Sequence, residues 1–395
     1  AYGAEAVEVE ARESAAFEAW LAGVYARHPR ATLNHFEHNV AVWRQLWRTQ
    51  HAADVVVIIT DARYPLFHLP PSFVAESCED LGKRVIVVLN KADLVPQAHL
   101  DAWVAYLKRR FPAVAAVLPF STSGADLSEA KGVSARRRAI LAAQRSKRPD
   151  VMERRMSCVR RLVAVCGAEP EVVESVEAAA WAAAGLTDDH SGEEEGVEEV
   201  PTHDDDVGDR PEGTKLVIGM VGQPNVGKSS LINTLCGTKR VSVSRTAGHT
   251  KHLQTLDIVD GLRLIDCPGL VFPRLLAPAD GDESAYTGLN SPARQRALQE
   301  ACGVLPLAQV REPYSAIRLL MENMPLENKF GVKLPADEEE WTPLLFCETY
   351  AAKRGYRTHK GKGQPDPHRG GREVLQACCD GNLLLLVAPP IVVRE

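Results

Sequence analysis

The sequence predicts an α/β fold in which a mostly parallel, six-stranded sheet carries helices on both faces, with a small, mainly helical domain at the C-terminal end. Six short, β-branched segments are bounded by turn residues, as strands are. Helical patterns lie between the early segments, and this alternation is typical of parallel sheets. The expected strands are Val55–Asp61, Arg84–Asn90, Ala115–Ser121, Lys215–Gly222, Leu253–Ile258 and Leu262–Cys267.

The expected helices are identified by apolar residues that recur at helical spacing. One such pattern spans Leu100–Phe111, and a basic one runs from Val151 to Cys166. From about Ser291 onward the pattern is helical with proline breaks, which indicates the second, smaller domain. The apolar run Leu383–Val393 is too short to span a bilayer and predicts a buried C-terminal strand or packing segment.

The net charge of -6 conceals two opposed blocks. Residues 169–212 contain 16 acidic side chains and one basic residue, whereas residues 131–161 contain 11 basic side chains and two acidic ones. Residues 167–213 also have few bulky apolar side chains, so their composition predicts a disordered acidic linker. Because 45% of the whole chain is hydrophobic, disorder throughout the chain is excluded.

The cysteines and the N-terminus bear on the compartment. Nine cysteines without a CxxC pair argue against a disulfide framework or a zinc ribbon and fit a reducing environment. No signal peptide opens the chain, although it begins at Ala1 without Met. We expect a cytoplasmic or nuclear protein, the nucleolus included, that is neither secreted nor membrane-spanning.

The segment Gly222–Ser229 matches the pattern G-x-x-x-x-G-K-[ST] between an expected strand and an expected helix, as the P-loop motif requires. Backbone N–H groups of such a loop wrap phosphate oxygens, and the helix N-terminus adds positive potential. Lys228 is expected to reach the β and γ phosphates and to act in catalysis, and Ser229 to ligate Mg²⁺. The expected nucleotide-binding residues are Gln223, Pro224, Asn225, Val226, Gly227, Lys228, Ser229 and Ser230.

A second motif, Asp-Cys-Pro-Gly, ends the sixth expected strand at Asp266–Gly269. A carboxylate in this position can hold the Mg²⁺ shell, and the glycine N–H can meet a γ-phosphate. Alone, DxPG is a common turn. Because it lies about forty residues after the P-loop, we expect Asp266 to bind the metal and nucleotide and Gly269 to act at the γ-phosphate.

A third motif, Asn-Lys-Ala-Asp, closes the second expected strand and indicates guanine recognition. The Asp93 carboxylate can accept two hydrogen bonds from the guanine N1–H and amino group, which adenine does not offer. Beside a P-loop, this selects GTP over ATP. We expect Asn90, Lys91 and Asp93 to bind the base, with Ser121 and Thr122 of a Ser-Thr-Ser-Gly turn supporting it.

The order of these motifs is unusual. In most G proteins the P-loop comes first and the base-recognition motifs last, whereas here residues 90–93 precede residues 222–229. The same sheet forms if the old termini are joined and the chain is cut elsewhere, as circular permutation allows when termini lie close together. Residues 125–213 would be the joining segment.

With these motifs in place, the chain resembles the circularly permuted GTPases of the ribosome-assembly type, near the guanine nucleotide-binding protein-like and large-subunit GTPases. The resemblance covers most of the chain outside residues 125–213, so it implies a circularly permuted P-loop GTPase domain. It rests on the motifs above together with Phe36–Asn39, Trp43–Arg48, Ile59–Pro65, Val241–Thr250 and Gln309–Tyr314.

The resemblance also implies roles and boundaries. Thr250, in the Gly-His-Thr stretch, takes the family's switch I role and closes over Mg²⁺ and the γ-phosphate, which makes it a catalytic and metal-binding candidate. The expected units are an N-terminal helical segment (1–50), the first half of the GTPase domain (51–166), the acidic linker (167–213), the second half (214–290) and the C-terminal helical domain (291–395).

Hydrolysis is expected to be slow without an activator. Small G proteins place a Gln after DxxG to orient the attacking water, but this chain has Leu270, which can form no hydrogen bond through its side chain. Asn225 is a catalytic candidate because its side-chain oxygen can coordinate K⁺ in place of an arginine finger; the alternative is that Asn225 only shapes the loop. His249, also possible for orienting water, lies three residues before His252, and the pair lacks the other ligands of a metal shell.

The expected cofactors are GTP or GDP and Mg²⁺, with K⁺ as a candidate. Two basic segments, residues 131–161 and 353–372, are candidates for contact with a ribosomal subunit or ribosomal RNA, although such runs are also often solvated faces. Two functions stay open: a GTP-hydrolysing switch acting on a maturing ribosomal subunit, and a regulatory GTP-binding adaptor for protein partners with negligible hydrolysis. A monomer suffices for either function.

Overall fold

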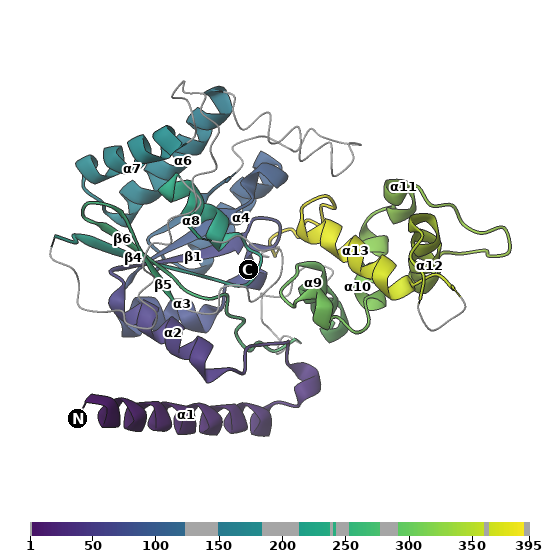
Figure 1. The fold of residues 1–395 in the computed structure, drawn as a ribbon, viewed down its shortest axis with the longest axis horizontal. Coiled ribbons are helices and arrows are strands. Elements are labelled where there is room, and N and C mark those ends of the chain that lie inside the picture. The colour runs from purple at the N-terminus through teal and green to yellow at the C-terminus, as the bar shows by residue number, and fades with distance from the viewer. Residues whose placement is uncertain are drawn as a thin grey trace, which may run out of the picture.

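The computed structural model describes residues 2–122, 149–183, 213–237, 240–241, 253–276, 291–358 and 363–390. Their arrangement is drawn in Figure 1. The strands are β1 (Val55–Asp61), β2 (Arg84–Asn90), β3 (Ala116–Pro119), β4 (Leu216–Gly222), β5 (Gln254–Val259) and β6 (Leu262–Asp266). The helices are α1 (Tyr2–Arg27), α2 (Val40–Ala52), α3 (Pro71–Ala75), α4 (Gln97–Arg110), α6 (Pro149–Cys166), α7 (Pro170–Ala183), α8 (Lys228–Cys236), α9 (Pro292–Ala301), α10 (Tyr314–Asn323), α11 (Leu326–Phe330), α12 (Pro343–Arg354) and α13 (Pro367–Cys379).

The six strands form one sheet in the order β3-β2-β1-β4-β6-β5. All neighbours are parallel except β5, which runs antiparallel to β6. The predicted six-stranded, mostly parallel α/β fold is confirmed. The first strand of the chain pairs with the P-loop strand β4 at the centre of the sheet, so the two halves of the sequence interlock in one domain.

Alternate side chains of β1 enter two different cores. Val56 and Ile58 belong to the cluster that contains α2 and α4. Val57 and Ile59 belong to the cluster that contains α6, α7 and α8. Because strand side chains point alternately to the two faces of a sheet, this central strand is apolar throughout, as expected when both faces are covered.

Residues 167–213 are not a linker throughout, and for residues 170–183 the prediction of disorder is wrong. Here α7 packs Val172, Val173, Val176 and Ala180 into the core that contains α6. These apolar positions recur at helical spacing, and the glutamates occupy other positions of the helix. The average composition concealed the buried stripe. Residues 184–212 lie outside the described part of the chain.

The helices α9–α13 form a smaller domain that docks against the sheet domain at one end (Figure 1). Side chains at the N-caps of three of them accept hydrogen bonds from the first turn, as N-cap side chains do. These residues are Ser291 for α9, Thr342 for α12 and Asp366 for α13.

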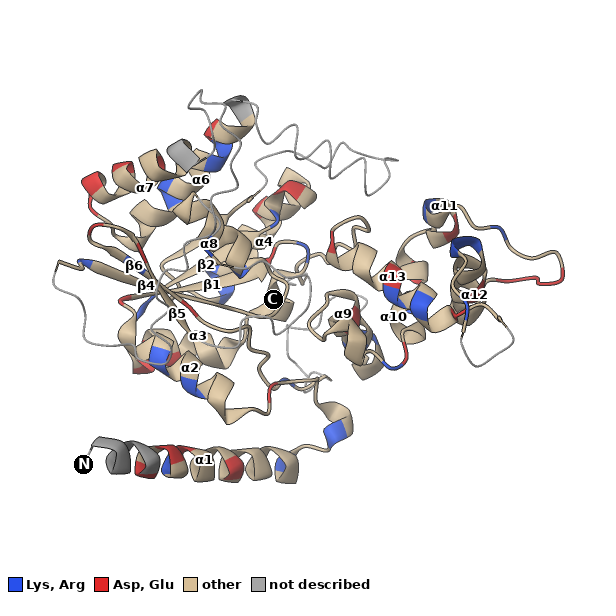
Figure 2. Cartoon of the chain, viewed as in Figure 1, with Lys and Arg blue, Asp and Glu red and all other residues tan. Residues whose placement is uncertain are grey.

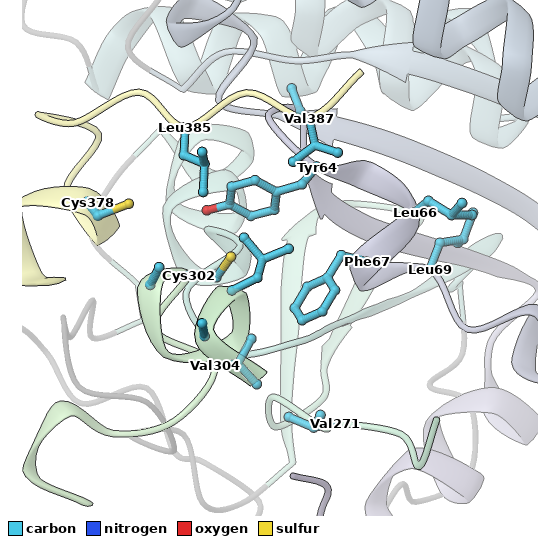
Figure 3. Close-up of a cluster of buried hydrophobic side chains, with 14 of the residues drawn as sticks. Tyr64, Leu66, Phe67, Leu69, Val271, Cys302, Val304, Cys378, Leu385 and Val387 are labelled. Atoms are coloured by element: carbon cyan, nitrogen blue, oxygen red, sulfur yellow. The ribbon is translucent and has the colours of Figure 1, made fainter. Parts of the chain in front are cut away.

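The segment after α13 (residues 383–390) and the loop after β1 (residues 62–69) contribute to the same apolar cluster, where the two domains meet (Figure 3). Leu385 and Val387 of this segment are buried. The Val387 N–H donates to the carbonyl of Arg63, 2.9 Å away, and the Trp103 indole donates to the carbonyl of Val387 at 3.0 Å. The apolar run predicted as a strand or packing segment is therefore a packing segment over its described part, which ends at residue 390.

All nine cysteines are free thiols, and five of them are buried, in agreement with the expectation that no disulfide framework supports the fold. No helix among the described residues combines the length and the apolar character that crossing a bilayer requires.

Candidate functional site

The site lies where four parallel strands end at one edge of the sheet. β1 ends at Asp61, β2 at Asn90, β4 at Gly222 and β6 at Asp266. Asp61 is in register with Asn90, and Asp266 is one strand away from the start of the P-loop. Ligands of open α/β sheets bind outside the carboxyl ends of strands in this way. The predicted motifs of both halves thus meet at one place.

The P-loop leads from β4 into α8 along a tightly packed path. Gly227 has φ +97°, and a Cβ atom there would lie 2.3 Å from the side-chain nitrogen of Asn90. Glycine is therefore required by both the left-handed backbone and the close approach of the guanine motif. Ser229 and Ser230 lie in the first turn of α8 and are half-buried.

Lys228 is buried and turns back onto its own loop. Its Nζ donates to the carbonyls of Gly222 and Gln223 at 2.9 and 3.0 Å. Burial lowers the pKa of Lys228, while the nearby carboxylate of Asp266 acts to raise it. A phosphate would offer this ammonium a charged acceptor in place of two neutral carbonyls, and charge-assisted hydrogen bonds are the stronger kind.

Asp266 is 1% exposed, and neither of its carboxyl oxygens has a hydrogen-bond partner within the described ranges. Burial raises the pKa of Asp266 to about 6, and Lys228 opposes that rise. A buried carboxylate without partners is unfavourable unless a cation or donor joins it. Its chemistry fits a hard divalent cation, which prefers oxygen ligands.

The turn after Asp266 lies directly against the P-loop. A Cβ atom on Gly269 would come within 3.0 Å of the backbone nitrogen of Pro224, so this position accepts only glycine without a shift. The Leu270 N–H donates to the carbonyl of Gly222 at 3.3 Å, and its side chain is 1% exposed within the apolar core. Leu270 is thus a packing residue in this structure.

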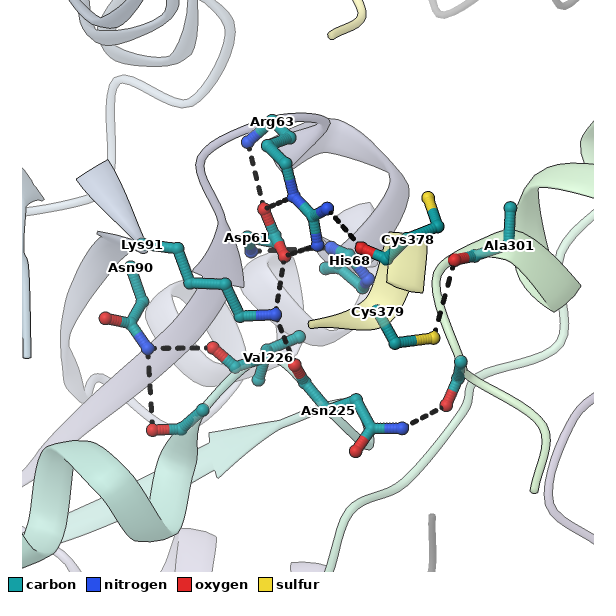
Figure 4. Close-up of polar contacts among 12 residues, drawn as sticks. Asp61, Arg63, His68, Asn90, Lys91, Asn225, Val226, Ala301, Cys378 and Cys379 are labelled. Atoms are coloured by element: carbon teal, nitrogen blue, oxygen red, sulfur yellow. Dashed lines mark hydrogen bonds and ion pairs between the residues drawn. The ribbon is translucent and has the colours of Figure 1, made fainter. Parts of the chain in front are cut away.

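The guanine motif binds the P-loop directly (Figure 4). The side-chain nitrogen of Asn90 donates to the carbonyl of Val226 at 2.8 Å, and Lys91 Nζ donates to the carbonyl of Asn225 at 2.7 Å. Ser121 Oγ donates to the Asp93 carboxylate at 2.7 Å. The residues predicted to recognise the base are therefore held by contacts from both halves of the chain.

A protein-family model described as a 50S ribosome-binding GTPase matches residues 217–330. This stretch begins in the P-loop strand and includes the Asp266–Gly269 turn. It leaves the guanine motif outside, because that motif precedes the P-loop in this chain.

Whole-chain comparisons find relatives of the same type. Guanine nucleotide-binding protein-like 1 from Pongo abelii is 33% identical over 407 residues, with 97% of this chain and 62% of the relative covered. GTPase LSG1-1 from Arabidopsis thaliana is 31% identical over 401 residues, with 98% of this chain and 66% of the relative covered. The chain belongs to the circularly permuted GTPase family.

The chain spans only part of this relative, because the alignment covers 62% of the length of guanine nucleotide-binding protein-like 1. Among solved structures, GNP-bound YlqF from T. maritima is 18% identical with a TM-score of 0.44, covering 88% of this chain and 96% of that one.

Some predicted residues of the permuted GTPase domain lie outside the described part of the chain. Thr250, His249 and His252 are among them, so no contact of the expected switch I is described. Thr122 follows Ser121 in the chain and is half-buried. No group of three or more His, Cys, Asp or Glu residues suited to a metal occurs among the described residues.

Sequence reasoning missed a buried charged cluster beside the site. Asp61 and Arg63 are 1% and 0% exposed and form a two-pronged ion pair, with Arg63 Nε and Nη2 at 2.9 and 2.7 Å from the carboxylate oxygens. Lys91 Nζ lies 2.8 Å from the same carboxylate. Burial alone would raise the pKa of Asp61, but Arg63 and Lys91 hold it well below its usual range. The Asp-Ala-Arg sequence at a strand end was the available signal.

Proposed function

We propose that this chain binds GTP and hydrolyses it as a molecular switch that acts on a ribonucleoprotein, in the assembly of a ribosomal subunit. One observation carries the nucleotide assignment: the Asn90 side chain donates to the carbonyl of Val226 and lies against Gly227, so guanine and phosphate motifs form one site. The ribosomal part is supported by the matching family's description as a 50S ribosome-binding GTPase.

Asp266 and Ser229 are the described residues that would hold Mg²⁺, joined by Thr250 on the strength of the family resemblance. The fit rests on Asp266, whose two oxygens are buried and have no partner in the described structure. When bound, Mg²⁺ neutralises charge on the phosphate oxygens. Lys228 would bind the β and γ phosphates, and the Gly269 N–H would meet the γ-phosphate.

The residues of this chain support slow hydrolysis on their own. Leu270 is packed into the core and has no side-chain polar atom with which to orient water. An activating partner or a monovalent cation would therefore be needed to complete the site. Asn225 is the candidate ligand for K⁺. Its side-chain nitrogen donates to the carbonyl of Gly303, which leaves the side-chain oxygen pointing away from that carbonyl (Figure 4).

The second basic segment is the candidate surface for RNA. Lys353, Arg354, Arg357 and Arg369 are exposed around α12 and the start of α13, where Figure 2 shows basic residues. The guanidinium of Arg369 lies 4.2 Å from the centre of the Tyr356 ring. Exposed cations beside an aromatic ring suit phosphate contact and base stacking.

Cations of the first basic segment, over its described part, bind other groups of the protein, as Arg354 of the second segment binds Glu373. On α6, Arg155 donates to the hydroxyl of Thr234 at 3.3 Å, and Arg160 forms an ion pair with Glu177 of α7. Both arginines therefore contribute to packing of α6 against its neighbours. The nine free cysteines accord with a cytoplasmic or nuclear location, which is part of this proposal.

The test is the GTPase rate of the purified chain with and without purified ribosomal subunits. We expect low intrinsic turnover that subunits stimulate, and an Arg357→Gln/Arg369→Gln variant that loses most of the stimulation. Arg12→Gln on α1, another exposed arginine, is the matched control and should keep it. A GTPase rate that stays near zero with either subunit would favour the alternative, a GTP-binding adaptor with negligible hydrolysis. The buried, apolar side chain of Leu270 is the observation that supports this alternative.

A further inference from the structure

A continuous chain of polar contacts joins the P-loop to the C-terminal domain through buried charges (Figure 4). It begins at the carbonyl of Asn225, which accepts from Lys91 Nζ at 2.7 Å. Lys91 Nζ also lies 2.8 Å from the Asp61 carboxylate. One acceptor in the P-loop and one at the end of β1 thus fix the ammonium of the guanine motif.

Arg63 continues this chain into the C-terminal domain. Its Nε and Nη2 bind Asp61, and its Nη1 donates to the carbonyl of Cys378, in the last turn of α13, at 2.8 Å. The Arg63 carbonyl accepts the Val387 N–H. Arg63 therefore holds two separate parts of the C-terminal domain while it neutralises Asp61.

A second contact runs in parallel from the same P-loop residue. The Asn225 side-chain nitrogen donates to the carbonyl of Gly303, just after α9, at 2.6 Å. Gly303 has φ +69°, and a Cβ atom there would lie 2.8 Å from that nitrogen. The close approach requires glycine, so this meeting of P-loop and helical domain is built into the local sequence.

The electrostatic environment makes these contacts interdependent. Inside the domain interface, Asp61 faces two cations, and His68, also buried, has its pKa lowered to about 3 by burial and therefore stays neutral. Removing one partner from a buried ion pair leaves the others poorly solvated. Undocking of the helical domain would admit water and take away the acceptor of Arg63 Nη1.

We propose that Arg63 and Asp61 are positioning residues that couple docking of the C-terminal domain to the affinity of the guanine nucleotide site. This proposal rests on the GTP binding proposed above. With the domain docked, Arg63 orients Asp61, and Asp61 orients Lys91 for the nucleotide. When a ribonucleoprotein draws the helical domain away, Lys91 loses its fixed partner and the nucleotide leaves faster. This coupling runs through the contacts from Cys378 to Arg63, Asp61 and Lys91, and it does not involve Thr250.

The first test is a double-mutant cycle on the full chain, measured as the Kd and release rate of fluorescent GDP. Arg63→Gln leaves the Asp61–Lys91 pair neutral, and we expect about tenfold weaker binding, equivalent to about 1.4 kcal/mol. In a Lys91→Ala background the same change should have less than about a twofold effect, because coupled residues are not additive. Equal losses in both backgrounds would show a merely structural role and overturn the proposal.

Arg263→Gln is the matched control. Arg263 binds Asp257 through the same two nitrogens, at 2.7 and 2.8 Å, but on the β5–β6 hairpin where Asp257 is exposed. The Arg263→Gln variant should keep GDP affinity within about twofold of the wild-type value, since exposed ion pairs contribute little. If Arg63→Gln fails to fold, Arg63→Lys keeps the charge but loses the fork geometry, and the same cycle applies.

The second test uses the reciprocity of coupled equilibria: if docking tightens GDP binding, GDP must tighten docking by the same factor. Hydrogen exchange at the Val387 amide reports docking because that N–H donates to Arg63. We expect GDP to slow amide exchange in residues 383–388 of the wild type but not of Arg63→Gln. No GDP effect in the wild type would overturn the coupling, whereas absence of GDP binding altogether would refute the proposed function instead.

Discussion

The base side and the phosphate side of the nucleotide site differ in how far the protein itself satisfies their polar groups. On the base side, Ser121 donates to Asp93, and Lys91 lies between the Asp61 carboxylate and the P-loop. The neutral side-chain oxygen of Asn90 is buried there without a partner in the described part of the chain, but both carboxylates of that side are paired. On the phosphate side, the buried oxygens of Asp266 have no partner among the residues described, and Lys228 turns back onto neutral carbonyls. We therefore expect a base side that is largely preorganised and a phosphate side that a bound nucleotide and cation would complete.

This difference suits a switch. Binding to a preorganised base side requires little ordering of side chains, so it can supply affinity that is the same for GDP and GTP. The phosphate side holds an unpaired charge that a ligand and cation would neutralise, so its interactions depend on which nucleotide and cation are present. The following variants test this division.

The largest effect is expected for Asp93→Asn. The carboxylate would accept two charge-assisted hydrogen bonds from guanine, each contributing about 1.5–3 kcal/mol, so GTP and GDP affinity should fall roughly 10²–10⁴-fold. Affinity for xanthine nucleotides should rise, because the Asn amide can donate to the xanthine 2-oxygen. Competition binding with both nucleotides checks this. Asp101→Asn, an exposed aspartate on α4, is the control, and equal affinities in Asp93→Asn and wild type would contradict the assignment.

Asp266→Asn should stabilise the nucleotide-free protein while it abolishes Mg²⁺-dependent GTP binding. The pKa of Asp266 is raised to about 6 by burial, so its charged form destabilises the fold by up to about 3 kcal/mol at neutral pH. The folded state binds the Asp266 proton more tightly than the unfolded state does. The free energy of unfolding of the wild type therefore falls as the pH rises from about 4 to 6. Thermal unfolding should therefore separate variant from wild type at pH 7.5 and not at pH 4.

A matched comparison is Asp257→Asn, because that carboxylate is exposed and its pKa is lowered, chiefly by the hydrogen bond from Arg263. The expected change in stability at neutral pH is small and of opposite sign. A destabilised Asp266→Asn would mean that the carboxylate has a partner within the fold rather than in the ligand.

A smaller effect on the phosphate side concerns the monovalent cation. We expect GTP turnover several times faster in K⁺ than in Na⁺, and Asn225→Ala should remove the difference. GDP affinity of Asn225→Ala also reports the Gly303 contact, so the ratio of rates in the two salts, not the absolute rate, is the decisive quantity. Equal wild-type rates in both salts would eliminate the cation role.

How much the sequence reveals differs between the motifs and the contacts around them. Residues 90–93, 222–229 and 266–269 are local patterns, and the parallel strands that precede them determine where they meet. The Arg63–Cys378 contact joins residues 315 positions apart, and no spacing rule predicts it. Helix α7 was concealed because its buried side chains are small and alternate with glutamates that dominate the composition.

Ser121→Ala should have the smallest effect, and it tests preorganisation of the base side directly. The hydroxyl donates to Asp93 at 2.7 Å and holds the carboxylate in place. Loss of one such hydrogen bond costs about 0.5–1.5 kcal/mol, so GDP affinity should fall roughly two- to tenfold, with discrimination against adenine nucleotides retained. Isothermal titration should assign the loss to a less favourable binding entropy, because Asp93 must then be ordered by the ligand. If Ser121→Ala instead lost as much affinity as Asp93→Asn, the base side would depend on its ligand as the phosphate side does.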